Sequence, residues 1–140
     1  EKMVTKLGIK MKSKYNLDEE FNKTVNSITK EFMLERCKLY KVQHRKNEDT
    51  LETLCVKYLR KLDKMEPWDI PDDENGNAGW INPDRILEDE AIKLTLARIK
   101  KTPFQKTYED KVRNLIRGYI KQIEAAELIK KYKKYMPKKR

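Results

Sequence analysis

The sequence predicts an all-α protein, with three or four amphipathic helices and an irregular acidic linker rich in Pro and Gly. Apolar residues recur at intervals of three and four along most of the chain, which is the helical period. Charged residues make up 40% of the chain and hydrophobic residues 38%, whereas a typical globular domain has about 25% charged residues. This composition favours long helices that share narrow apolar stripes with one another or with a partner.

Charge divides the chain into three regions. Residues 1–65 form a basic helical segment or hairpin, 66–82 an acidic linker, and 83–140 a helical pair with a basic tail. The whole chain carries a net charge of +10, but its acidic residues are concentrated between positions 66 and 92. A basic end of this density is suited to phosphate, anionic lipid head groups or acidic protein surfaces.

The N-terminal region contains one recognisable helix start and a second, weaker one. Residues 1–15 are basic and polar and are typical of an extended arm or a short amphipathic turn. Asn16, followed by three acidic residues, predicts a helix start with Leu17, Phe21 and Val25 on its apolar face. A polar stretch over 41–50 precedes another apolar stripe that runs to about Met65. The pattern allows one long helix or two over residues 16–65, and an up-down hairpin is preferred because helices beyond about 25 residues are unusual. The chain begins at Glu1 without an initiator Met, as a chain does when a targeting segment is missing.

The acidic linker contains two of the five prolines and both tryptophans, and a third proline, Pro83, follows it directly. We expect Trp68 and Trp80 to dock the linker onto the helices, because large aromatic side chains gain most from burial. At its end, Asn82-Pro83 predicts a helix start, in which Asn caps free backbone N–H groups and Pro occupies the first turn. Thr102-Pro103 repeats this signal and predicts a second helix with a stripe from Tyr108 to Ile129.

The residues expected to bind a partner are the two tryptophans and the cations of the C-terminal region: Trp68, Trp80, Arg113, Arg117, Lys121, Lys130, Lys131, Lys133 and Lys134. No candidate emerges for catalysis, for a cofactor or for a metal, and no small-molecule substrate is indicated. His44 has no ligand or carboxylate at a useful spacing, and Cys37 and Cys55 are expected to be reduced and buried. Gly-rich phosphate loops and nucleophile motifs are absent from the sequence.

One stretch resembles a known family. Gly79-Trp80-Ile81-Asn82-Pro83-Asp84, the acidic run from Glu88 to Glu90, and Leu96-Ala97-Arg98-Ile99 are similar to the 14 kDa subunit of the mitochondrial cytochrome bc1 complex. After a short break, Tyr108-Glu109-Asp110 followed by Arg113 and Arg117 continues the similarity, which covers about residues 79–129. The chain departs from the family in having Ile99-Lys100 where the family has Leu-Pro, and in its longer N-terminal part.

The resemblance implies a non-catalytic subunit of ubiquinol–cytochrome c reductase (respiratory complex III) that lies on the matrix side of the mitochondrial inner membrane. Its partners would be other protein subunits of that membrane complex, with anionic lipid head groups as a further possibility. The alternative is a basic RNA-binding subunit of an organellar ribosome or other ribonucleoprotein, whose tail lies along RNA. The acidic region over 66–92 argues against simple coating of nucleic acid, since phosphates would repel it.

Overall fold

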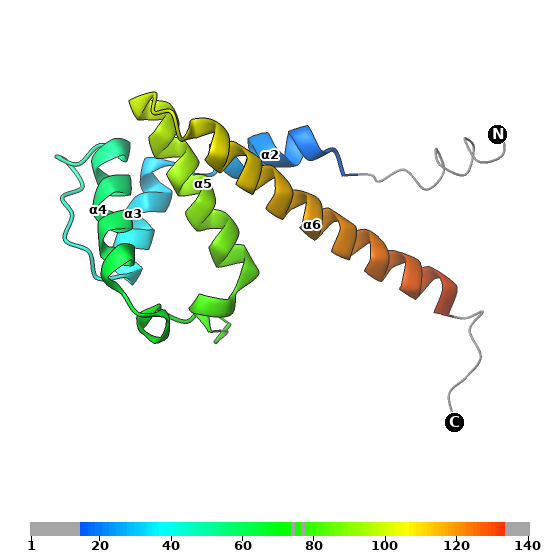
Figure 1. Ribbon diagram of the computed structural model, residues 1–140. Helices are drawn as coiled ribbons and strands as arrows, with labels where there is room; N and C mark the ends of the chain where they lie inside the picture. The colour runs from blue at the N-terminus through cyan, green and yellow to red at the C-terminus, as the bar shows by residue number, and fades with distance from the viewer. Residues whose placement is uncertain (1–14, 74, 77, 134–140) are drawn as a thin grey trace.

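The computed structural model describes residues 15–73, 75–76 and 78–133 (Figure 1). Over these residues the chain is helical and contains no strand, which confirms the predicted all-α class. The elements are α2 (Leu17–Asn26), α3 (Lys30–Leu39), α4 (Leu51–Lys64), the 3-10 turns η1 (Pro67–Asp69) and η2 (Gly79–Ile81), α5 (Pro83–Lys100) and α6 (Gln105–Tyr132). The predicted arm over 1–15 lies outside the described residues, apart from Tyr15.

Polar caps start four of the helices. Asn16 Oδ1 accepts from the N–H of Asp18 at 2.8 Å, and Asn82 Oδ1 accepts from the N–H of Asp84 at 2.9 Å, with Pro83 in the first turn of α5. Thr29 and Thr50 cap α3 and α4 in the same way. The predicted starts at Asn16 and Asn82 are therefore confirmed, because a short polar side chain satisfies backbone donors that have no partner within the helix.

Three helix boundaries differ from the sequence prediction. The stripe from Leu17 onward belongs to two helices, because Ser27 donates its hydroxyl to the carbonyl of Thr24 at 2.6 Å and Thr29 starts a new helix. Residues 16–65 thus form three helices, of which α3 and α4 make the expected hairpin. Thr102-Pro103 lies in the turn before α6, which begins at Gln105.

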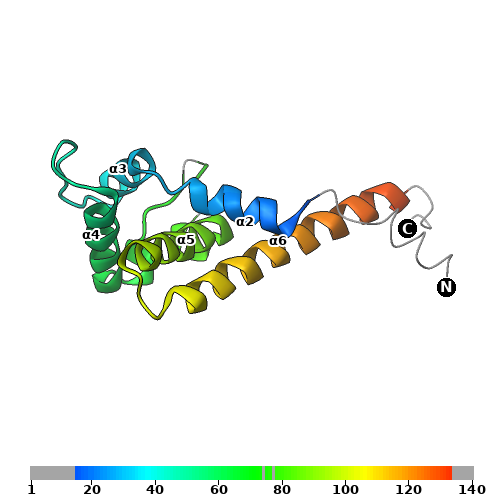
Figure 2. The same ribbon diagram turned by 90° about the horizontal axis from the view of Figure 1, so that it is seen from above.

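The helices form two hairpins and one crossing element. α3 packs against α4, α5 packs against α6, and α4 joins the hairpins through α5. α2 lies against both α5 and α6, as the two views agree (Figures 1 and 2). α6 runs on past the helices that it contacts, so that its C-terminal turns project from the bundle (Figure 2). No helix among the described residues is both long and apolar enough to cross a bilayer.

The five α-helices of the described residues contribute to one core, whose buried members are Phe21, Val25, Ile28, Met33, Cys37, Tyr40, Leu54, Cys55, Tyr58, Ala91, Ile92, Leu94, Val112 and Ile116. Cys37 and Cys55 are both free and buried, as predicted. Burial raises the pKa of Cys37 to about 11 and that of Cys55 to about 12. Both thiols therefore stay protonated at neutral pH and act as small apolar side chains.

The predicted stripe of α6 is buried only in its first half. Val112 is fully buried and Ile116 is 4% exposed, whereas Ile123 is 41% and Ile129 58% exposed. The change occurs because α6 continues beyond the bundle, and no other helix among the described residues lies beside its second half to bury the stripe. The expectation that one continuous face of this helix packs inward is thus wrong for its C-terminal half.

Trp68 also differs from expectation. Its side chain is 75% exposed, so it does not dock the linker onto the helices. The linker is held instead by close backbone packing at Gly79, where a Cβ atom would lie 2.1 Å from the carbonyl oxygen of Pro71 and 2.7 Å from the side chain of Ile70. The side chain of Trp80 lies outside the part of the chain that the structure describes.

Asp49 anchors the loop between α3 and α4. Its Oδ2 accepts from the backbone N–H of Arg45 at 2.7 Å, and Lys57 Nζ lies 2.8 Å from Oδ1. The hydrogen bond from Lys57, followed by that from the N–H of Arg45, lowers the pKa of Asp49 to about 2. The carboxylate therefore stabilises the fold only while it is ionised.

We predict opposite effects of the same substitution at two glycines. Gly79→Ala should destabilise the fold by about 1–3 kcal/mol, because the new methyl group meets backbone that cannot move freely. Gly118→Ala is the matched control: no atom lies within 4 Å of its Cβ position, and alanine should stabilise the exposed side of α6 by up to about 1 kcal/mol. Urea unfolding of both variants measures this, and equal effects at the two sites would contradict the packing described for Gly79.

A second prediction concerns acid stability. Since the folded pKa of Asp49 lies below its ordinary value of 3.8, its contribution should be complete above about pH 4 and disappear as the pH falls towards 2. Asp49→Asn should lower the free energy of unfolding at pH 6, and the gap to the unchanged protein should close between these two pH values. Asp63→Asn, on the exposed side of α4, controls for the loss of one negative charge. A gap that stays constant down to pH 2 would rule out this role.

Candidate functional site

The most prominent polar feature of the interior is a network centred on Arg36. α3 supplies Arg36, α4 supplies Tyr58, and α5 supplies Glu88 and Asp89. Arg36 Nη1 lies 3.0 Å from Asp89 Oδ1 and donates to Tyr58 Oη at 3.2 Å, while Nη2 is paired with Glu88 Oε1. The hydroxyl of Tyr58 donates to Asp89 Oδ1. One guanidinium thus connects three helices.

Aromatic rings surround the same guanidinium. The Cζ atom of Arg36 lies 5.1 Å from the ring centroid of Phe32, 5.8 Å from Tyr40 and 5.6 Å from Tyr58. Arg36 is only 6% exposed, so these contacts operate in a region of low dielectric, where cation–π attraction and ion pairing are strongest. Arg36 is buried because it lies on the inward face of α3, which also carries Phe32, Met33 and Tyr40.

The protonation states follow from the surroundings. Burial raises the pKa of Tyr58 well above its ordinary range, and the nearby carboxylate of Asp89 adds to the rise, so the phenol stays protonated and donates. Burial also raises the pKa of Asp89, and the hydroxyl of Tyr58 and the guanidinium of Arg36 oppose that rise. The network therefore keeps the phenol of Tyr58 protonated as a donor, and Asp89 accepts from both Tyr58 and Arg36.

Arg85 forms a second, adjoining contact. Its Nη1 donates to Tyr40 Oη and to the carbonyl oxygen of Pro71, both at 2.9 Å. The ring of Tyr40 packs edge-on against Tyr58, with centroids 4.9 Å apart. Arg85 thereby ties the linker to α3 and to the network of Arg36.

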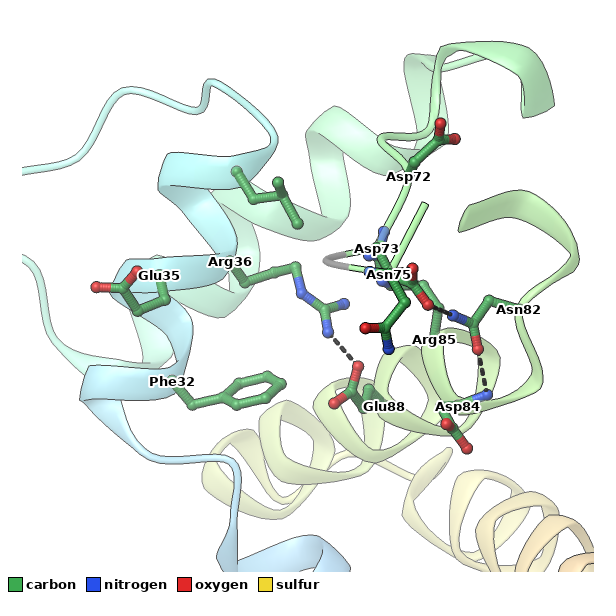
Figure 3. A pocket seen from close by; sticks show the side chains of 11 residues that line it. Phe32, Glu35, Arg36, Asp72, Asp73, Asn75, Asn82, Asp84, Arg85 and Glu88 are labelled. Carbon is green, nitrogen blue, oxygen red and sulfur yellow. Dashed lines mark hydrogen bonds and ion pairs between the residues drawn. The ribbon is translucent and has the colours of Figure 1, made fainter. Parts of the chain in front are cut away.

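A cleft opens beside these two arginines (Figure 3). It has a volume of about 530 Å³ and lies between α3, the linker and the start of α5. Asn82 Nδ2 donates to Asp73 Oδ2 at 2.8 Å and closes one side of it. Its lining residues are Phe32, Glu35, Arg36, Leu39, Asp72, Asp73, Asn75, Asn82, Asp84, Arg85 and Glu88. Five carboxylates outnumber two arginines, so the cleft is acidic.

The polar side chains of the network are engaged with one another. The guanidinium of Arg36 is already paired, the phenol of Tyr58 stays protonated, and both thiols are buried and protonated. Among residues 15–73, 75–76 and 78–133, no group of three or more His, Cys, Asp or Glu side chains is placed to hold a metal ion. His44 lies in the loop before α4, where its Nδ1 is 2.8 Å from the carbonyl oxygen of Val42.

The residues predicted to bind a partner do not gather at the cleft. Arg113 is engaged within the chain: its Nη1 lies 2.7 Å from Asp18 Oδ1, and its guanidinium lies 4.2 Å from the ring centroid of Phe21 on α2. Arg117 and Lys121 are exposed on α6, and Arg117 donates to Asn114 Oδ1 at 3.1 Å. The remaining described cations, Lys130, Lys131 and Lys133, lie exposed at the C-terminal end of α6. Lys134 lies outside the described residues, and Trp68 is exposed in the linker.

Sequence reasoning missed the network of Arg36. The available signal was a cation at a position that the helical period assigns to the apolar face, four residues before Tyr40. An arginine on an inward face requires an acid on a facing helix, and Asp89 holds such a position on α5, where its side chain is 15% exposed. The identity of that partner depends on tertiary packing and is not contained in the local pattern.

We predict that Arg36→Met destabilises the fold by about 3–5 kcal/mol, because it leaves Asp89 and Tyr58 buried without their shared partner. Arg45→Met is the control: this residue pairs with Glu48 at the surface, where Arg45 is 76% exposed, and its loss should cost no more than about 1 kcal/mol. Urea unfolding measures both. Adding Asp89→Asn to Arg36→Met should restore part of the loss, since a buried amide is less costly than a buried carboxylate. Similar small losses in both single variants would show that the network is not important for stability.

Comparison with protein-family models, with curated protein sequences and with solved structures gave no match. Arguments about function therefore start from the arrangement of this chain's own residues and from the resemblance of the stretch that forms η2, α5 and most of α6.

Proposed function

We propose that this chain is a non-catalytic assembly subunit of a respiratory membrane complex, ubiquinol–cytochrome c reductase, on the matrix side of the mitochondrial inner membrane. It would act by joining neighbouring protein subunits. The observation that carries the proposal is the second half of α6, which extends beyond the bundle and exposes Ile123, Leu128, Ile129 and Tyr132 on a basic helix. An exposed apolar surface of this kind is typical of a region that contacts a partner protein or a membrane in an assembly.

The body of the protein supports the same proposal. The network of Arg36 and the contacts of Arg85 bind the helices and the linker into one unit, which suits a subunit that positions an arm. The stretch that resembles the cytochrome bc1 subunit coincides with the α5–α6 hairpin that carries this arm. The hairpin is thus both the part with a family resemblance and the part with an uncovered surface.

RNA binding is the rival function, and it is supported by the lysines at the end of α6. Lys131 Nζ lies 5.5 Å from the ring centroid of Tyr132, a pair that can contact a phosphate and a base. Against it stands the apolar side of the same turns, where Leu128 and Ile129 are 37% and 58% exposed. Phosphate groups would leave both side chains in water.

The test is purification of the tagged chain from mitochondrial membranes in mild detergent, at low and at high salt. The proposal predicts that subunits of ubiquinol–cytochrome c reductase co-purify at both salt concentrations. RNA that co-purifies with the chain at low salt and is lost steeply as salt rises would favour the rival function instead. In a plot of the logarithm of the binding constant against the logarithm of the salt concentration, the slope would then be roughly −1 per phosphate contact.

We further predict that changing Lys130, Lys131 and Lys133 together to Gln lowers the yield of the assembled complex but leaves its turnover per haem unchanged. Each cation near an anionic surface contributes only about 1 kcal/mol, so the three must be removed together. The control variant changes Lys38, Lys46 and Lys61, which are exposed on the α3–α4 side of the bundle. A normal yield with reduced turnover would indicate a direct role in electron transfer and would contradict the proposal.

A further inference from the structure

The apolar surface of α6 changes sides between the two halves of the helix. In the first half, Val112 and Ile116 face α5 and α2 and are buried. Successive residues of an α-helix are rotated by about 100°, which places Ala125, Leu128, Ile129 and Tyr132 on roughly the opposite side from Ile116. Leu128, Ile129 and Tyr132 are 37%, 58% and 43% exposed. These four residues, at spacings of three, four and seven, form a second apolar face that we call the tip patch.

The tip patch lies on the side of α6 that faces away from the helices of the core. α2 and α5 both pack on the side of α6 that carries Val112 and Ile116. A longer α2 or α5 would therefore cover Ile123 rather than the tip patch. The patch thus requires an occupant that approaches α6 from the side away from the bundle.

Basic residues lie on all sides of the helix around the tip patch, whereas the acidic residues lie on one side only. Lys121, Lys130, Lys131 and Lys133 are exposed and, at about 100° per residue, point in four different directions around the helix axis. The two acidic residues of this stretch, Glu124 and Glu127, fall on the half of the helix that contains Ile116. The occupant of the tip patch is therefore anionic and meets cations on several sides of the helix.

We propose that the tip of α6, residues 125–133, inserts into the head-group layer of an anionic lipid bilayer. This inference rests on the proposed function and names the surface that the arm would meet. Leu128, Ile129 and Tyr132 would reach the boundary of the acyl chains, while the lysines extend to lipid phosphates around the helix. The aromatic ring of Tyr132 beside Lys131 suits the interface between water and acyl chains.

Other occupants fit the arrangement less well. A groove on a protein receives one side of a helix and would leave the lysines on the other side without partners. RNA would pair with the lysines and leave the apolar side chains in water. A second copy of the chain would bring two sets of lysines together and would be opposed by like-charge repulsion.

The experiment is sedimentation of the full chain with phosphatidylcholine vesicles that do or do not contain cardiolipin. We expect binding to the cardiolipin vesicles and little binding to phosphatidylcholine alone. Changing Leu128, Ile129 and Tyr132 together to Ser should weaken binding by at least about tenfold, because three apolar side chains then lose their burial in the bilayer. The control changes Ile81, Ile86 and Ile99 to Ser, which are 57%, 43% and 42% exposed and lie away from the tip, and should bind like the unchanged chain. Circular dichroism verifies that both variants remain helical.

Three results would overturn the proposal: equal binding to both kinds of vesicle, unchanged binding of the tip variant, or loss of binding in the control variant alone. If the tip variant binds vesicles normally but no longer co-purifies with protein subunits, the tip docks on a protein instead. The vesicle assay needs no other subunit, so its outcome is separate from the proposed function. A chain that binds vesicles through the tip but never co-purifies with the reductase would support this inference and refute the proposed function.

Discussion

The pairing of Arg36 with Glu88 and Asp89 is the interaction on which the packing of α3, α4 and α5 depends. Apolar stripes alone allow neighbouring helices to slide by a turn, because one aliphatic side chain can replace another at little cost. A buried guanidinium allows no such exchange, since any register that separates it from a carboxylate leaves a charge without a partner. We interpret the network as the feature that selects one arrangement of these helices, and Arg85 extends it to the linker through Pro71.

Local signals predicted the helices well, because a cap needs only the residues beside it. Asn16 and Asn82 start α2 and α5 as their sequence context indicates. The break at Ser27–Thr29 was missed because the apolar period continues across it, and only the hydrogen bonds of the two hydroxyls end one helix and start the next. The role of Arg36 was missed for a different reason: the two carboxylates that pair with it lie more than 50 residues away in the chain.

Burial was harder to predict than helicity. The stripe of α6 is a property of the sequence, but its burial depends on how far the neighbouring helices extend. Tyr119 is still half-buried, whereas Ile123 is 41% exposed. Trp68 illustrates the same limit. The size of its side chain predicted burial, but the side chain is exposed. The tight packing of Gly79 against Ile70 and Pro71 holds the linker without a contribution from Trp68. Of the candidate cations, Arg113 is engaged by α2, whereas those of the α6 tip remain exposed.

The separation of charge within the fold favours a bridging subunit over a protein that coats RNA. The acidic cleft lies among α3, the linker and α5, while the exposed lysines lie at the end of α6. The helix rises about 1.5 Å per residue, so Tyr132 is roughly 24 Å along the axis from Ile116, the last buried residue of α6. A continuous helix of this length keeps the two charged regions apart and prevents the lysines from neutralising the cleft. Each end can therefore attract a surface of opposite charge, whereas a nucleic-acid backbone would be attracted to the lysines and repelled by the cleft.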